Sequence, residues 1–180
     1  MYPLDPVVGM IVCSSLALLF AVASAHKLRA LSEFAETLSG YRVLPAMLVR
    51  PASRLVPVLE GLVAAGLLIR PARESASLAG AVLLAIYAVA MALNLLRGRR
   101  QLDCGCLGPG GGGVVSVALV WRNVLMALTL AAAGGTRWSS RRMDWLDLGT
   151  ALAAACAMAL LYVAANGLLA SAAHPRLRRE

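Results

Sequence analysis

Charged residues are scarce in this chain of 180 residues: 14% are Asp, Glu, Lys or Arg, whereas 60% are hydrophobic. The mean hydropathy of +0.76 is higher than a water-soluble domain of this size can hide in one core. This excludes a soluble globular protein. We predict an all-α fold, an integral membrane bundle of four to five transmembrane helices with one amphipathic interfacial helix. No internal repeat is evident, so we expect a single integral membrane domain over residues 1–180.

Acidic residues are scarcer still, with 9 Asp+Glu against 17 Lys+Arg and a net charge of +8. In a soluble protein this excess would favour nucleic-acid binding. Here the basic residues lie mostly at the ends of apolar segments, as the positive-inside rule and contact with anionic lipid headgroups arrange them. The sequence therefore predicts a multi-pass protein of the cell (cytoplasmic) membrane, with membrane lipid and no nucleic acid among its partners.

The chain has only two histidines and four cysteines. Zinc requires about four Cys, His or carboxylate ligands. The loop after residue 100 contains two cysteines and Asp103 but no histidine, so we predict no metal site. No nucleotide-binding, haem or flavin fingerprint occurs either, and we predict no cofactor, although a quinone bound between helices would leave no sequence motif.

Long apolar runs are what the chain has in abundance. Runs of about 20 apolar residues are typical of transmembrane helices. We predict five spans, at residues 7–25, 51–69, 78–96, 114–133 and 146–173. The first run lacks the basic start and the short apolar region of a signal peptide, so its ending Ala23-Ser24-Ala25 only imitates a cleavage site and we expect a retained helix.

Residues 28–41 have a different pattern. Leu28, Leu31, Phe34, Leu38 and Tyr41 recur at helical spacing, with polar residues between them. This predicts an amphipathic helix, ended by Leu44-Pro45. Its apolar side either lies in the headgroup region of the membrane or packs on neighbouring helices.

Counting basic residues over five alternating spans gives eleven on one side and five on the other. The positive-inside rule then predicts an external N-terminus and an internal C-terminus. This orientation places the loop near residue 104 at the cytoplasmic face, whereas stable disulfides belong to the oxidising side of a membrane. The face from which this loop is reached stays open.

The sharpest local signal is Cys104-Gly105-Cys106, which precedes Gly110 to Gly113. A disulfide between residues i and i+2 bends the backbone at the residue between them, where glycine has the least steric cost. Such a strained, accessible disulfide has an oxidising potential suited to exchange. Arg99 and Arg100 favour a thiolate here and Asp103 opposes it; two free thiols are the alternative. We expect Cys13 and Cys156, inside apolar spans, to be small buried thiols.

Four polar residues interrupt the apolar segments: Glu60, Asn94, Arg122 and Asn123. Each is costly in lipid and should face the bundle interior, another polar group or water. We consider a pair between Glu60 and Arg122, with either a structural or a functional role. Lys27 follows the first apolar run, where its side chain is expected to reach out to the membrane interface.

Several motifs occur in an order that resembles a known family. They are His26-Lys27-Leu28, Phe34, Tyr41-Arg42-Val43-Leu44-Pro45, Glu60-Gly61-Leu62, Asp103-Cys104-Gly105-Cys106-Leu107-Gly108 and Arg122-Asn123. Over residues 5–135 this succession resembles the methylamine utilisation protein MauE family, itself similar to DoxX-like membrane proteins; the helix at 146–173 lies beyond it. Leu107 stands where the family often has Phe, and the glycine run is unusually bare.

The resemblance implies a small multi-helix membrane protein that works with a thioredoxin-like partner while methylamine dehydrogenase, whose small subunit is dense in disulfides, matures. It makes Cys104 and Cys106 the exchanging pair of a thiol–disulfide oxidoreductase component. Asp103, Gly105, Arg122, Asn123, Glu60 and Lys27 would be supporting residues. Two alternatives are a non-redox assembly factor and a small transporter whose path is lined by Glu60, Arg122 and Asn123.

Overall fold

The computed structural model describes residues 5–99, 115–135 and 144–172, with side chains as far as residue 165. In these ranges the chain forms helices and no strand, which confirms the all-α prediction. The elements are α1 (Pro6–Arg29), α2 (Leu31–Tyr41), α3 (Ala46–Leu68), the short 3₁₀ helix η1 (Arg70–Ala72), α4 (Arg73–Leu96), α5 (Val117–Gly135) and α6 (Trp145–Ala172).

Five of the described helices are long and apolar enough to cross a membrane: α1, α3, α4, α5 and α6. Their number confirms the prediction, but α1, α3 and α4 are longer than predicted, and α4 begins at Arg73, five residues before its predicted start. Helix α1 continues to Arg29, so that Leu28 belongs to α1 and not to the amphipathic helix. Helix α3 begins after Pro45, five residues before the predicted start, and contains both Pro51 and Pro57.

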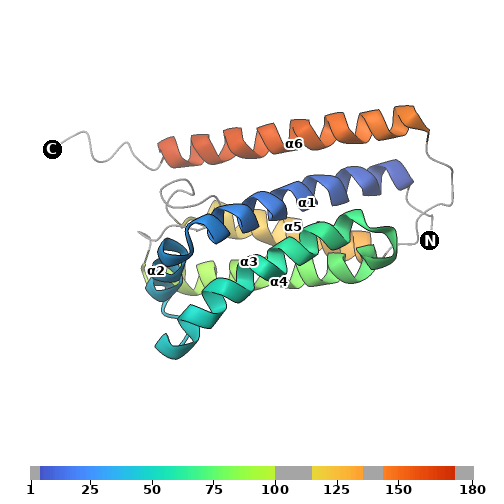
Figure 1. Cartoon of the computed structure of the whole chain (residues 1–180). Coiled ribbons are helices and arrows are strands. Elements are labelled where there is room, and N and C mark those ends of the chain that lie inside the picture. Colours follow the sequence, from blue (N-terminus) through green and yellow to red (C-terminus); the bar gives the residue numbers. More distant parts are fainter. Residues whose placement is uncertain (1–4, 100–114, 136–143, 173–180) are drawn as a thin grey trace.

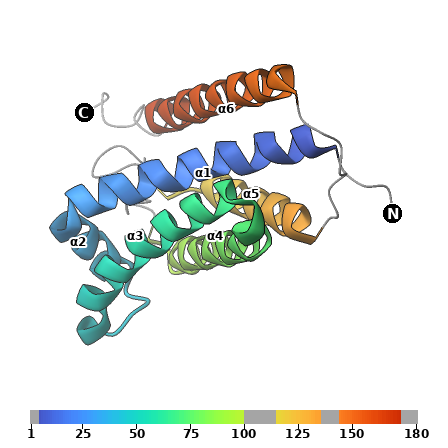
Figure 2. The same cartoon turned by 45° about the vertical axis from the view of Figure 1, so that its right-hand side comes forward.

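The helices form a bundle with one helix laid along its side (Figure 1). Helix α1 packs on α3 and on α6, and α4 packs on α5 and on α3. The short α2 lies at the end of the bundle where α1 ends and α3 begins, and the turned view shows α6 beside α1 at the edge of the molecule (Figure 2).

The core lies between α1, α3, α4 and α5. Phe20, Leu67 and Leu130 are almost completely buried there. Gly80 of α4 marks a close contact within this core: a Cβ at this position would lie 2.9 Å from Leu130 Cδ1 and 3.0 Å from Val63 Cγ1. Side chains of α3 and α5 therefore occupy the space that glycine leaves, as is common where membrane helices approach closely.

Of the two placements predicted for the amphipathic helix α2, the structure shows packing on neighbouring helices. It packs mainly on α3, Tyr41 is buried, and Phe34 and Leu38 line a cavity beneath it. Helix α2 ends at Tyr41, and the capping residue after it, Arg42, has left-handed backbone angles (φ 48°, ψ 37°) that only a few per cent of non-glycine residues adopt. The apolar side thus packs on neighbouring helices.

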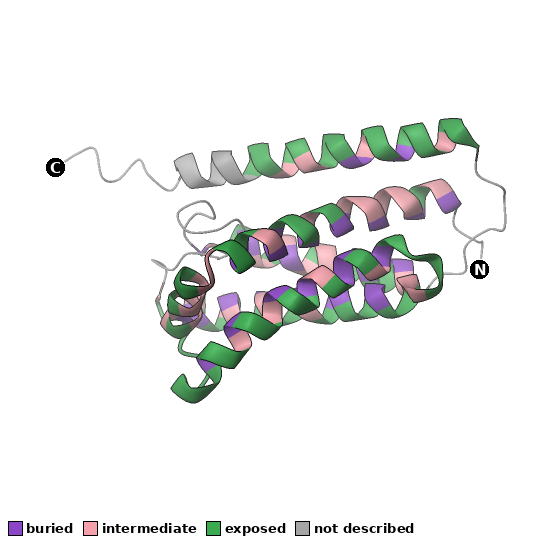
Figure 3. Ribbon diagram, in the orientation of Figure 1, coloured by how far each residue is buried: buried purple, intermediate pink, exposed green. Residues whose placement is uncertain are grey.

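Helix α6 is less buried than the other four helices that are long and apolar enough to span a membrane (Figure 3). Of its described side chains, Ala151 and Ala155 are buried, and they lie one turn apart, on one narrow face. Cys156 is next to Ala155 but is exposed. The expectation of a buried thiol is wrong for Cys156, because adjacent helical residues point in different directions. It is confirmed for Cys13, which is 1% exposed.

Candidate functional site

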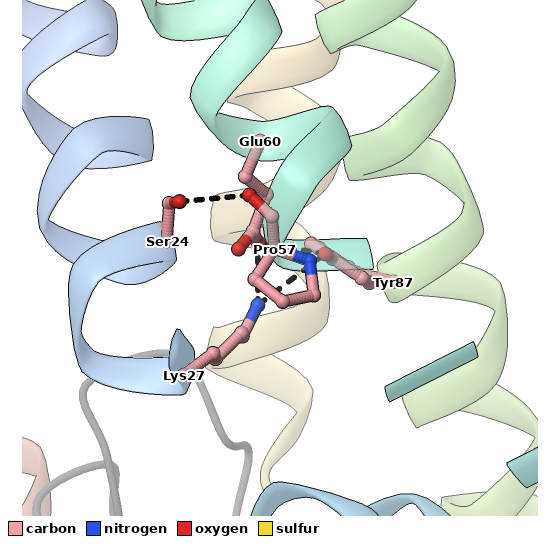
Figure 4. Close-up of polar contacts among 5 residues, drawn as sticks. All are labelled: Ser24, Lys27, Pro57, Glu60 and Tyr87. Carbon is pink, nitrogen blue, oxygen red and sulfur yellow. Dashed lines mark hydrogen bonds and ion pairs between the residues drawn. The ribbon is translucent and has the colours of Figure 1, made fainter. Parts of the chain in front are cut away.

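A buried cluster of ionisable side chains joins three helices (Figure 4). Lys27 of α1 forms an ion pair with Glu60 of α3, and the two side chains are 4% and 1% exposed. Tyr87 of α4 donates a hydrogen bond to Glu60 Oε1 over 2.7 Å and lies 3.3 Å from Lys27 Nζ. Each pair of these three residues is therefore in direct contact, so the cluster ties α1, α3 and α4 together.

Close packing of α1 against α3 brings this cluster together. Ser24 lies one turn before Lys27 and donates a hydrogen bond to the carbonyl oxygen of Pro57 over 2.7 Å, as drawn in Figure 4. A Cβ on Gly61 would lie 3.3 Å from Ser24 Oγ. The small side chains at positions 24 and 61 allow the two helices to approach, and the same approach carries Lys27 to Glu60.

Two aromatic rings lie against the Lys27 ammonium group. Its Nζ is 5.0 Å from the centre of the Phe34 ring and 4.8 Å from that of Tyr87. Both distances are within the range of cation–π attraction. Lys27 also lines a cavity of about 70 Å³, together with Thr37, Tyr41 and other residues of α2, α3 and α4. Helix α2 therefore covers the cluster and a small space beside it.

The expectation that Lys27 reaches out to the membrane interface is wrong. Its position near the end of α1 would allow this, but the Glu60 carboxylate supplies a counter-charge inside the bundle. A buried charge is tolerated when it is paired and hydrogen-bonded. The suggested ion pair between Glu60 and Arg122 does not form, because Glu60 is paired with Lys27.

The other intramembrane polar residues lie elsewhere. The Arg122 guanidinium group of α5 stacks over the ring of Tyr162 in α6, 4.9 Å from its centre. Asn123 and Asn94 are buried, and each donates to the carbonyl four residues earlier, over 2.9 Å to Leu119 and 3.0 Å to Ala90. These contacts do not assemble Glu60, Arg122 and Asn123 around one described cavity.

The predicted redox residues Asp103, Cys104, Gly105 and Cys106 lie outside the described residues. The chain on both sides of them is described and meets the end of α2. Before them, Arg99 Nη1 lies 3.5 Å from the Gly40 carbonyl oxygen. After them, Val115 is buried in a cluster with Tyr41, Met91 and Leu119. Both flanks therefore adjoin the helix that covers Lys27.

The chemistry available at the cluster follows from its unsatisfied groups. Glu60 Oε2 is buried and has no hydrogen-bond partner in the part of the chain that the structure describes. A buried carboxylate oxygen without a partner costs about 1–3 kcal/mol or more. The contacts that Glu60 does make, with Lys27 and Tyr87, link α3 to α1 and α4, so the cluster can hold these helices in register.

Metal binding finds no support among the described residues, where no group of three or more His, Cys, Asp or Glu side chains is placed to hold an ion. The cluster contains only one carboxylate. The cation paired with that carboxylate is the Lys27 ammonium group.

Sequence reasoning identified Glu60 and Lys27 but missed Tyr87 and Ser24. Tyr87 is a tyrosine in an otherwise apolar segment, and a buried tyrosine hydroxyl usually has a hydrogen-bond partner. That was a usable signal for a polar contact, although it does not name the partner. Ser24 carried no signal of its own, because a serine in a transmembrane helix can equally bind its own backbone.

Comparison with known proteins assigns the sequence to a family. A family profile described as methylamine utilisation protein MauE matches residues 6–137. The chain belongs to the MauE family. This match contains the complete Lys27, Glu60 and Tyr87 cluster and ends before α6.

The similarity of this MauE-family chain to curated relatives covers more of the chain than the family profile does. It is 41% identical over 152 residues to the methylamine utilization protein MauE of Paracoccus denitrificans, covering 84% of this chain and 81% of that protein. It is 37% identical over 164 residues to MauE of Paracoccus versutus, covering 91% and 88% of the two chains. For MauE of Methylophilus methylotrophus the identity is 32% over 163 residues, with coverage of 90% and 86%. No solved structure matches the chain significantly.

Proposed function

We propose that this MauE-family protein is the membrane component of a thiol–disulfide exchange system. Cys104 and Cys106 exchange a disulfide with a thioredoxin-like partner. The exchange serves the maturation of an extracytoplasmic protein such as methylamine dehydrogenase. Family membership supports a role in methylamine utilisation, since that is how the matching relatives are named.

The Cys104-Gly105-Cys106 sequence is the observation that carries this proposal. The other two thiols are poor candidates. Cys13 of α1 is buried in the core of the bundle, and Cys156 is on the exposed side of α6. Thiol–disulfide exchange proceeds by attack of a thiolate on a disulfide sulfur, which requires an accessible thiol. A thiol inside an apolar span is rarely a thiolate.

The described residues that precede Cys104 also support the proposal. Arg97 Nη1 lies 3.3 Å from the Arg42 carbonyl oxygen and Arg99 adjoins Gly40, so two guanidinium groups are present at the end of α4. Cationic groups favour thiolates in their neighbourhood. Lys27 cannot contribute a full charge here, because Glu60 neutralises it.

Trapping the mixed disulfide tests the proposal. Exchange passes through an intermediate in which one cysteine is bonded to the partner while the other waits to resolve it. We expect Cys104→Ser and Cys106→Ser each to abolish client maturation. Only one of them should accumulate a covalent complex with the partner, visible on a non-reducing gel and lost in dithiothreitol.

Cys13→Ser and Cys156→Ser are the matched controls and should retain maturation without a covalent complex. The competing function is a non-redox assembly factor, favoured by the three-helix cluster that holds the bundle rigidly around Glu60. If the double variant Cys104→Ser, Cys106→Ser supports client maturation at the normal rate, the exchange proposal fails and the assembly function replaces it.

A further inference from the structure

An exposed apolar stretch joins α2 to α3 at one end of the bundle. Every residue from Arg42 to Leu48 is exposed, and four of them carry large apolar side chains: Val43, Leu44, Met47 and Leu48. Met47 is the most open of these, at 81%. We call these four side chains the α2–α3 patch. Single exposed apolar residues are normal, whereas a contiguous group of them is typical of an interaction site.

The patch lies beyond the length of chain that α3 needs to cross a membrane. About 20 residues span the hydrocarbon core, and twenty residues counted back from Ile69 reach Arg50. Helix α3 begins at Ala46, so its first turn extends past that boundary. Figures 1 and 2 show the start of α3 beside α2 at the end of the bundle, where it diverges from α4. Lipid tails therefore do not cover the patch.

The charges around the patch are of one sign. Arg42, Arg50 and Arg54 are all exposed, and residues 42–54 contain no Asp or Glu. Protein interfaces commonly have an apolar centre, in which methionine is enriched, and a polar rim. Complementary rim charges guide two proteins into contact. The patch therefore fits a partner surface that is apolar at its centre and bordered by carboxylates.

The chain that leads to the redox cysteines leaves α4 beside this patch. Gly98, with φ 74°, ends α4 in the hydrogen-bond pattern of a glycine-terminated helix. Arg97 Nη1 lies 3.3 Å from the carbonyl oxygen of Arg42. Cys104 is five residues after Arg99, and five residues span at most about 18 Å. A protein seated on the patch is consequently within reach of Cys104.

We propose that the α2–α3 patch is the docking surface for the thioredoxin-like partner, with Met47 as its central contact and Arg50 and Arg54 as its charged rim. This inference rests on the proposed function, because it concerns the partner of that exchange. A thiolate of one protein attacks the disulfide of the other and forms a mixed disulfide, which the second cysteine resolves. One disulfide replaces another, so the step needs no further oxidant.

The test measures how fast the mixed disulfide forms in membranes of cells that contain the full-length protein. The background is the cysteine variant that traps the partner, Cys104→Ser or Cys106→Ser, combined with Cys13→Ser and Cys156→Ser. The trapped partner is identified by mass spectrometry. Loss of a central apolar contact weakens association about tenfold or more. We expect Met47→Glu to slow trapping by at least that factor.

The arginine rim is tested by its dependence on salt. Attraction between exposed charges is screened as ionic strength rises, so trapping by the unaltered patch should slow at high salt. We expect the double variant Arg50→Glu, Arg54→Glu to trap more slowly at low salt and to lose this salt dependence. An unchanged salt profile in that variant would remove both arginines from the docking surface.

Two controls separate docking from folding and from thiol chemistry. Ser32→Glu adds the same charge at an exposed position in the first turn of α2 and should trap at the unaltered rate. Dithiodipyridine, a small disulfide that needs no docking surface, should react with the remaining thiol equally fast in all variants. A general disturbance of the bundle would change that reaction as well.

The occupant is checked with a benzophenone-bearing amino acid in place of Met47. Irradiation should join this position to the same partner that the cysteine variant traps. Adducts with lipid alone would assign the patch to the membrane surface, and adducts with a second copy of this chain would assign it to a dimer. Either result overturns the inference.

Equal trapping by Met47→Glu and Ser32→Glu would also overturn it, while leaving the exchange proposal intact. Failure of the exchange proposal gives a different result: neither Cys104→Ser nor Cys106→Ser then traps a complex that dithiothreitol releases, whatever residue is at position 47.

Discussion

The bundle formed by α1 to α5 and the single helix α6 are both apolar enough to span a membrane, but they are held in very different ways. In the most apolar stretch of α1, 39% of the residues are buried inside the protein, against 11% in the corresponding stretch of α6. The bundle contains a buried ion pair and closely packed glycines. Helix α6 contacts mainly α1 and buries two alanines.

This difference shows that hydropathy and packing are separate properties of a membrane helix. Between helices in lipid there is little hydrophobic driving force, so close packing and polar contacts hold them together. The bundle has both kinds of contact at Gly80 and at Lys27 with Glu60. Helix α6 has a few small-residue contacts and the stacking of Tyr162 with Arg122. Substitutions that remove the contacts of the bundle should therefore cost far more than equivalent changes in α6.

The largest effect is expected at the ion pair. Lys27→Met leaves the Glu60 carboxylate buried without its cation, and breaking a buried pair in this way costs about 3–5 kcal/mol. The free energy of unfolding in mixed micelles, followed by circular dichroism, measures this loss.

The double variant Lys27→Met, Glu60→Met should recover most of the stability, because two apolar side chains of similar volume replace both charges. Arg54→Met, at an exposed position of α3, is the control and should change the free energy of unfolding by less than about 0.5 kcal/mol. A double variant as unstable as Lys27→Met would show that the pair is not the source of the cost.

An intermediate effect is expected at the glycines. Gly80→Ala places a Cβ against Leu130 and Val63 and should destabilise the protein by about 1–3 kcal/mol through overpacking. Gly149→Ala in α6 meets no atom within 4 Å and should stay within about 1 kcal/mol of neutral, or stabilise the helix. Equal losses at the two positions in the same unfolding assay would contradict the comparison.

The smallest effect is expected at the exposed thiol. Cys156→Leu enlarges a side chain on the open side of α6 and should change the free energy of unfolding by less than about 0.5 kcal/mol. Cys13→Leu adds volume in the core beside Leu16 and Phe20 and should cost about 1–3 kcal/mol. A loss at position 156 as large as that at position 13 would indicate that α6 has a second packing partner.

Much of the candidate site was predictable from residue type alone. Glu60, Asn94 and Asn123 are polar residues in apolar segments, and all three are buried as expected. Their partners were not predictable, because Lys27 and Glu60 are 33 residues apart in the sequence and meet only through the crossing of α1 and α3. Cys104 and Cys106 remain a prediction from the sequence and from family resemblance.

Local hydropathy and the length of the apolar runs were enough to predict that the protein is helical, how many apolar spans it has and roughly where they lie. That Lys27 is buried against Glu60 and that Tyr87 contacts both residues depends instead on how the helices pack. The packing also determines that Cys156 is exposed and that α1, α5 and α6 together line a cavity. These features depend on which helix faces approach one another, and small residues such as Gly61 and Gly80 set that approach from positions far apart in the chain.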